Sequence, residues 1–261
     1  MTSSDIEGKS EDNSERRRGH FSELLKIQGK LALREPSGVM GIALPFGLLV
    51  VFALISSAVP GNVGDTTYTT LDIYIPVVMV IGFVFIALGL PTTIVRDREI
   101  GWLRRISTTP VHPSRLLATQ LIINLIFALV TVLIIIFGAV VIFGAVLDVN
   151  LPLFVLSLIL SIATIFSLGL VLVAIAPSQA AATGLGGVFI FGLMFLSGLW
   201  TPPQAIGGPL ATIIYYSPSG AAVRALLNSI FNQPIPYATV VTLVVYTTIF
   251  AFLAIRYFRW E

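Results

Sequence analysis

Long apolar stretches without a charged residue follow one another along most of the chain. They cover residues 36–64, 73–95, 116–147, 149–223 and 225–255. A helix of about 20 apolar residues crosses the hydrocarbon core of a bilayer, so each stretch is long enough to span a membrane. The longest stretch must hold two crossings, because the proline-led polar sequence Pro177-Ser178-Gln179 divides it.

This pattern predicts an all-α membrane protein with six transmembrane helices. The predicted spans are Val39–Val59, Ile73–Val95, Thr119–Phe143, Leu151–Ala176, Ala180–Trp200 and Tyr237–Ile255. Residues 201–223 contain four prolines, which interrupt any continuous helix. We interpret this piece as short helices that form a re-entrant outer segment before the last helix.

The N-terminal region differs from the rest of the chain. Residues 1–20 are polar and rich in Ser, Glu and Arg, a composition typical of a disordered cytosolic tail. Residues 21–35 place Phe21, Leu24, Leu25 and Leu31 at helical spacing, which favours an amphipathic helix in the inner membrane interface, with a plain lead-in as the alternative. Residues 36–261 then form the six-span domain.

Composition supports a membrane protein and excludes several other classes. Hydrophobic residues make up 56% of the chain and charged residues 11%, whereas soluble domains are about 25% charged. There is no cysteine, which excludes disulfides, thiolate metal sites and cysteine nucleophiles. The basic residues lie beside acidic ones or along the membrane surface, so nucleic acid is not an expected partner.

The distribution of basic residues predicts the orientation. With the N-terminus inside, 14 of the 15 Lys and Arg residues fall on the inner side, and only Arg224 lies outside. Because basic residues accumulate on the cytoplasmic side of membrane proteins, we expect both termini in the cytosol.

The inner loop between the second and third spans, residues 96–115, has the richest pattern. Asp97 is placed to cap a short helix, with Glu99 in its first turn and Arg104 and Arg105 in its last, as the helix dipole favours. Ile100, Leu103 and Ile106 give this helix an apolar stripe. Composition alone leaves open whether it docks to a partner or only fixes the topology.

Two sets of residues carry a resemblance to a known family. The run Arg98-Glu99-x-Gly101-x-Leu103-x-x-Ile106-x-x-x-Pro110-Val111 resembles the loop after the second span in ABC-2 export permeases of the ATP-binding-cassette class. Similar to the same family are Leu196-Ser197-Gly198-Leu199-Trp200-x-Pro202, Ser217-Pro218 and Val223-Arg224-Ala225-Leu226. The resemblance extends from about Phe21 to the end of the chain.

The resemblance implies a multi-pass permease of the bacterial plasma (inner) membrane. It would work with a second permease copy or a close paralogue, with two cytosolic ATPase subunits and with membrane lipids around it. The loop helix, about residues 98–107, would be the coupling helix that inserts into the ATPase. The residues expected in this contact are Arg98, Glu99, Gly101, Trp102, Leu103, Arg104 and Arg105.

The energy source is expected on another chain. A phosphate-binding loop of the form G-x-x-x-x-G-K-[ST] is missing, and Gly8-Lys9-Ser10 lacks its first glycine. ATP and magnesium are therefore expected on the ATPase partner, with no cofactor bound by this chain. An ion-coupled secondary transporter is the alternative, weakened because the predicted spans contain no Asp, Glu, Lys, Arg or His.

An enzymatic function is not expected. The two histidines, His20 and His112, have no metal-ligand spacing, and no pair of acids lies within a span. We predict no catalytic residue and no metal site in this transport subunit.

The resemblance places the second and fifth spans at the central pathway. Candidate cargo contacts there are Met79, Phe83, Ile86, Phe191 and Phe195. These apolar, adaptable side chains suit amphiphilic cargo such as a drug, a lipid or a glycolipid. They suit packing or lipid contact equally well, so alternating-access export of such cargo is a hypothesis at this point.

Overall fold

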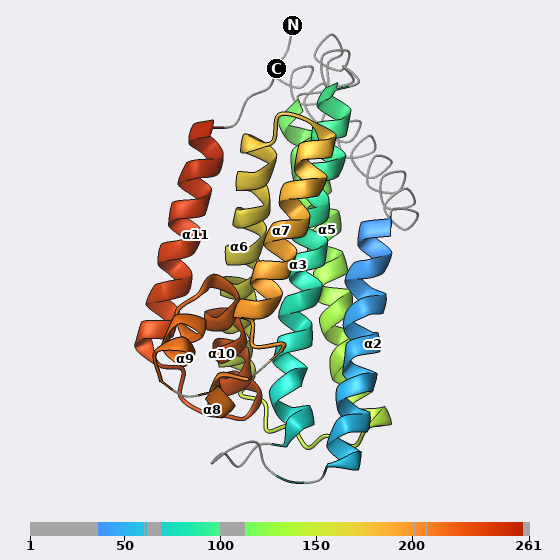
Figure 1. Ribbon diagram of the computed structural model, residues 1–261, viewed down its shortest axis with the longest axis vertical. Coiled ribbons are helices and arrows are strands. Elements are labelled where there is room, and N and C mark those ends of the chain that lie inside the picture. Colours follow the sequence, from blue (N-terminus) through green and yellow to red (C-terminus); the bar gives the residue numbers. More distant parts are fainter. Residues whose placement is uncertain are drawn as a thin grey trace, which may run out of the picture.

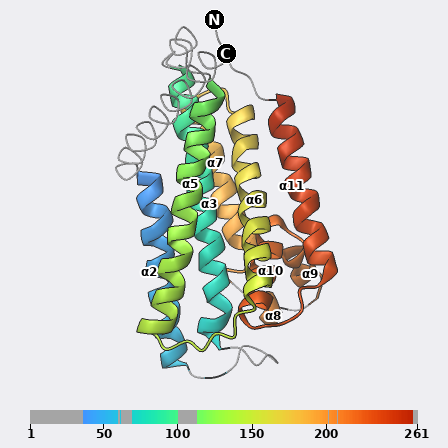
Figure 2. The same ribbon diagram turned by 180° about the vertical axis from the view of Figure 1, so that it is seen from behind.

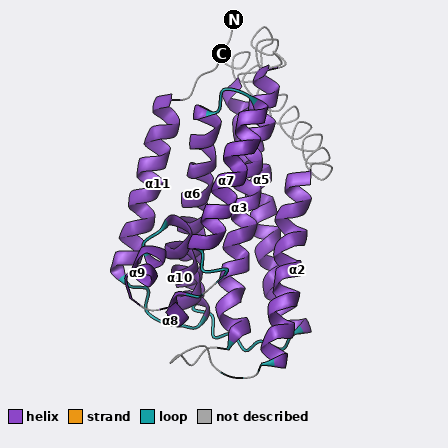
Figure 3. Ribbon diagram, in the orientation of Figure 1, coloured by secondary structure: helices purple, strands orange, loops and turns teal. Residues whose placement is uncertain are grey.

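The computed structural model describes residues 36–59, 61, 69–99, 113–200, 202–206 and 208–257. Within these residues the regular structure is helical and no strand occurs (Figure 3). The long helices are α2 (Pro36–Ala58), α3 (Thr70–Glu99), α5 (Pro113–Phe137), α6 (Leu151–Ile175), α7 (Gln179–Leu196) and α11 (Tyr237–Tyr257). Shorter elements are the π-helix η1 (Gly138–Ile142), α8 (Pro203–Ile206), α9 (Gly208–Tyr215) and α10 (Pro218–Ile230).

The six-span prediction is confirmed. In the described part of the chain, six helices are long and apolar enough to cross a membrane. These stretches are Met40–Ala58, Thr70–Arg96, Ala118–Ile142, Leu151–Ile175, Gln179–Leu196 and Tyr237–Tyr257. The Pro177 turn separates α6 from α7 as expected, with Ser178 as the N-cap of α7.

Helix α3 forms the centre of the bundle (Figures 1 and 2). It packs against α2 and α5 on one side and against α6, α7 and α10 on the other. Nearly all of its side chains between Ile73 and Leu88 are buried. Helices α2, α5, α7 and α11 instead expose many large apolar side chains, as expected of helices that face lipid or a partner.

A proline within α2 is accommodated by a neighbouring helix. Pro45 has no N–H, so the carbonyl of Gly41, four residues earlier, lacks its usual intrahelical donor. The buried Thr131 of α5 places its Oγ1 3.3 Å from that oxygen and 2.9 Å from the carbonyl oxygen of Phe127. The hydroxyl proton is shared between these two acceptors, so α5 satisfies the backbone of α2 where water has no access.

Gly169 of α6 lies against a second carbonyl that has lost its helical donor to a proline. Pro91 leaves the Ala87 carbonyl of α3 without its usual intrahelical donor. A Cβ atom on Gly169 would lie 2.5 Å from that carbonyl oxygen. The backbones of α3 and α6 are therefore in contact here, and only glycine fits.

Hydroxyl groups connect α6 to α10 and α11. Ser157 donates to the carbonyl oxygen of Ala225 at 3.1 Å. The Oγ1 atoms of Thr164 and Thr247 lie 2.8 Å apart, across the contact between α6 and α11. Interhelical hydrogen bonds of this kind stabilise packing in lipid, where polar groups have few other partners.

The short helices α8, α9 and α10 lie between α7 and α11, at the end of the bundle away from the α6–α7 turn (Figure 1). Ser217 caps α10 by accepting from the Gly220 N–H at 3.0 Å. Its Oγ lies 2.8 Å from the carbonyl oxygen of Ile214 and 3.1 Å from that of Leu196. A Cβ on Gly220 would clash with the carbonyl oxygen of Ile214. This junction joins the ends of α7 and α9 to the start of α10.

One sequence expectation is wrong, and several fall outside the described residues. Helix α3 continues to Glu99, so Asp97 lies inside it and is not the cap of a separate helix. Apolar packing against α6 and α7 extends along α3 as far as Val95, which is fully buried. The tail 1–20, the interfacial helix 21–35 and residues 100–107 lie outside the described part, and a re-entrant path for residues 201–223 stays a prediction.

The close contact at Gly169 predicts a specific instability. Gly169→Ala places its methyl group against a backbone oxygen, and we expect it to lower the free energy of unfolding by about 1–3 kcal/mol. Gly184→Ala is the matched control, because that exposed helical glycine has no neighbouring atom within 4 Å of a Cβ; it should be neutral or stabilising by up to about 1 kcal/mol. Thermal unfolding in detergent, followed by circular dichroism, measures both. Equal midpoints for the two variants would contradict the contact.

The Thr131 hydrogen bond predicts a coupling between two substitutions. Thr131→Val should destabilise the native chain by about 1 kcal/mol, because the Gly41 carbonyl loses its donor. In a Pro45→Ala background the new N–H can bond to that carbonyl, so the same substitution should cost markedly less. A double-mutant cycle on unfolding midpoints measures this difference. Strict additivity would show that Thr131 does not serve the carbonyl freed by Pro45.

Candidate coupling and transport sites

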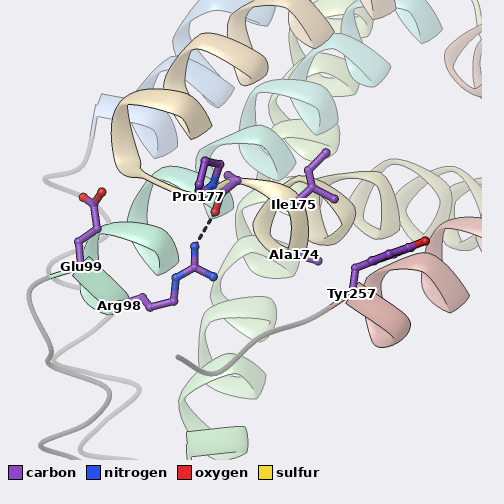
Figure 4. Close-up of a pocket in the computed structure, with 7 residues that line it drawn as sticks. Arg98, Glu99, Ala174, Ile175, Pro177 and Tyr257 are labelled. Carbon is purple, nitrogen blue, oxygen red and sulfur yellow. Dashed lines mark hydrogen bonds between the residues drawn. The ribbon is translucent and has the colours of Figure 1, made fainter.

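The end of α3 meets the turn between α6 and α7. Helix α6 ends at Ile175 with Ala176 as its C-cap, and Pro177 follows, a residue that cannot continue a helix. The Arg98 guanidinium donates a hydrogen bond to the carbonyl oxygen of Ala176 (Figure 4). A positive group is thus held at the negative end of α6, where the last carbonyls lack intrahelical donors.

The neighbouring residue Glu99 contacts the other side of the turn. Its Oε1 accepts a hydrogen bond of 3.0 Å from the backbone N–H of Gln179, the first residue of α7. The Ser178 side chain accepts from the Ala181 N–H at 3.1 Å. Glu99 and Ser178 therefore satisfy two N–H groups of the first turn of α7, and the carboxylate lies at the positive end of that helix.

An open pocket of about 660 Å³ lies beside this contact. In Figure 4, Arg98 points toward the turn at Pro177, and Tyr257 of α11 lies on the far side of the pocket. Ala174 and Ile175 at the end of α6 also line it. The pocket thus combines one arginine, one carboxylate and an apolar wall.

The predicted coupling residues divide into two groups. Arg98 and Glu99 are described, and both contact the α6–α7 turn of their own chain. Gly101, Trp102, Leu103, Arg104 and Arg105 lie outside the described residues, so their contact with an ATPase stays a prediction. The sequence showed the turn and the charged pair separately, but nothing in it indicated that residues about 80 positions apart would meet.

The predicted cargo contacts also divide into two groups. Met79, Phe83 and Ile86 of α3 are fully buried among helices of the same chain. On α7, by contrast, Phe191 is 65% exposed and Phe195 is 45% exposed. The structure therefore encloses the α3 residues and presents the α7 residues on a surface.

At the opposite end of the bundle, Arg224 of α10 pairs with an aromatic ring. Its guanidinium carbon lies 4.7 Å from the centre of the Tyr215 ring, within the range of a cation–π contact. Burial raises the pKa of the Tyr215 phenol above its ordinary value, and the positive charge of Arg224 opposes that rise. This pairing was not predicted, because the sequence showed Arg224 only as an outer basic residue within a run that resembles the family.

In the described part of the chain, no group of three or more His, Cys, Asp or Glu residues is arranged to hold a metal ion. The polar groups at both ends instead bind helix termini and an aromatic ring. Such contacts hold the helix ends in place.

Comparison with known proteins places the chain in a family of membrane proteins. The family model described as ABC-2 type transporter matches residues 20–231. A search of curated proteins gave no match. The matched range covers five of the six candidate spans and the short helices α8 to α10. The chain therefore belongs to the ABC-2 type transporter family and is a multi-pass membrane permease.

Proposed function

We propose that this permease is the membrane subunit of an ATP-driven exporter that moves amphiphilic cargo out of the cytoplasm by alternating access. It works with two cytosolic ATPase subunits, which bind the ATP and magnesium, and with a second permease copy or a close paralogue. The observation that carries the proposal is membership of the ABC-2 family by a chain without a phosphate-binding sequence of its own.

Charge distribution supports the proposed orientation in a bacterial inner membrane. The end of α3, the α6–α7 turn and the end of α11 lie at one end of the bundle, with Arg96, Arg98 and Arg256 (Figure 1). Arg224 belongs to α10 at the opposite end. Basic residues favour the cytoplasmic side, so we assign the end of α3 to the cytosol.

The exposed surface of α7 supports an amphiphilic cargo. Phe191 lies 6.1 Å from Trp200, measured between ring centroids, and Val188 next to it on the helix surface is also exposed. Aromatic and branched apolar side chains of this kind adapt to many apolar molecules. A strongly anionic polymer would find no cationic partner among them.

The ion-coupled alternative has weaker support. Within the six candidate spans the charged residues are Asp72, Arg96 and Arg256, all close to span ends. The buried hydroxyl groups of Thr131, Thr164 and Ser157 contact helix backbone. Carriers driven by protons or sodium generally hold ionisable or coordinating groups near the middle of the membrane.

Reconstitution tests the energy source. The permease should co-purify with a P-loop ATPase that has no spans of its own, for example one encoded by a neighbouring reading frame. In proteoliposomes the pair should move a fluorescent amphiphile against its gradient only with hydrolysable ATP. An ATPase variant that cannot hydrolyse ATP is the control. Uphill transport by the permease alone, driven by a cation gradient, would overturn the proposal.

A pair of phenylalanines tests the cargo surface. Phe191 on α7 and Phe252 on α11 are both 65% exposed, so they differ in location rather than in exposure. Phe191→Ala should weaken the apparent affinity for the amphiphile about fivefold, corresponding to a lost aromatic contact of about 1 kcal/mol. Phe252→Ala should leave it unchanged. The measurement is the half-saturating amphiphile concentration for stimulated ATP hydrolysis, and equal effects of both variants would remove α7 from the pathway.

A further inference from the structure

Two adjacent residues at the end of α3 form hydrogen bonds with the α6–α7 turn. Arg98 bonds to the last carbonyl before the turn, that of Ala176, and Glu99 bonds to the first N–H of α7, that of Gln179. Each charge has the sign that its helix end attracts. The end of α3 therefore connects the end of α6 to the start of α7.

Buried apolar side chains lie next to these two hydrogen bonds. Val95, Ala176 and Ala182 form a buried cluster that joins α3, the turn and the first helical turn of α7. Ile94 packs in the same way against Val173 of α6. Because these residues are small or branched and fully packed, the end of α3 has little freedom to slide against the turn.

The chain connectivity allows this contact to transmit movement from α3 to α6 and α7. Glu99 is the last residue of α3 and is followed directly by the loop that we expect to contact the ATPase. The α6–α7 connection is only Ala176, Pro177 and Ser178. Because α3 contacts both sides of this short connection, its end holds the end of α6 and the start of α7 together.

We propose that Arg98 and Glu99 are positioning residues that make the end of α3 and the α6–α7 turn move as one unit. Movement that the ATPase imposes on this end of α3 is then passed to α7, the helix that presents Phe191 and Phe195. In this arrangement the two charged side chains act within the permease and do not themselves bind the ATPase. The inference rests on the proposed function, because it requires an ATPase that moves the loop.

A reporter on α7 can test this transmission without knowledge of the cargo. The chain has no native cysteine, so Gly184→Cys offers a single attachment point for a nitroxide label in open space. Gly47→Cys on α2, another glycine with no atom within 4 Å of a Cβ, is the matched control position. The permease is reconstituted with its ATPase, and the label spectrum is compared before and after trapping with ATP, Mg²⁺ and vanadate.

In the native background we expect the spectrum at position 184 to change on trapping. In the Arg98→Ala/Glu99→Ala variant this change should become clearly smaller, because only the apolar contacts of Ile94 and Val95 remain. The affinity for the ATPase and any response at position 47 should stay the same. Glu99→Gln keeps an acceptor oxygen for the Gln179 N–H and should restore the response in large part. If the double variant does not fold, the single Glu99→Ala variant serves the same comparison, because the Glu99 side chain is exposed.

Two results would overturn the inference. A full response at position 184 in the double variant would show that the contact transmits nothing. A loss of ATPase affinity in that variant would show that Arg98 and Glu99 are docking residues. Failure of the native permease to bind any ATPase is a separate result, seen before any variant is made, and it would overturn the proposed function together with this inference.

Discussion

The fold depends on one constraint, which is that hydrocarbon offers no hydrogen-bond partner to a peptide group. Pro45 in α2 and Pro91 in α3 each remove a donor from their helix, and a neighbouring helix lies against the carbonyl left at each of these two points. Thr131 supplies a hydroxyl to the Gly41 carbonyl, and the backbone of Gly169 lies against the Ala87 carbonyl. The contact of α5 with α2 and the contact of α6 with α3 therefore each include a carbonyl that a proline has left without its helical donor.

The same requirement governs both ends of the bundle. At one end Ser217 joins the ends of α7 and α9 to α10. At the other end Arg98 and Glu99 satisfy peptide groups on either side of the α6–α7 turn. Helix α3 takes part in both regions, because it also packs against α10.

The sequence predicted the spans well but not their surroundings. Stretches free of charge located all six spans to within a few residues, because insertion into lipid depends mainly on apolar length. The same rule cannot distinguish Phe83, which is fully buried, from Phe191, which is mostly exposed, since lipid and protein interior both accept an apolar side chain.

The end of α3 was predicted wrongly because the prediction used only local sequence. Asp97 was assigned from local capping preference, whereas packing of Val95 against Ala176 and Ala182 extends the helix. The partners of Arg98 and Glu99 depend on tertiary contacts about 80 residues distant, which no local pattern encodes.

Helix α10 has a consequence for how the protein is made. It has 13 residues, too few to cross a bilayer, and nearly all of its side chains are buried between α3, α6 and α11. Its small and polar residues, such as Ser219 and Gly220, have no reason to partition into lipid from the translocon. Because α11 follows α10 along the chain and covers one of its faces, the packing of α10 is completed only after α11 has been synthesised.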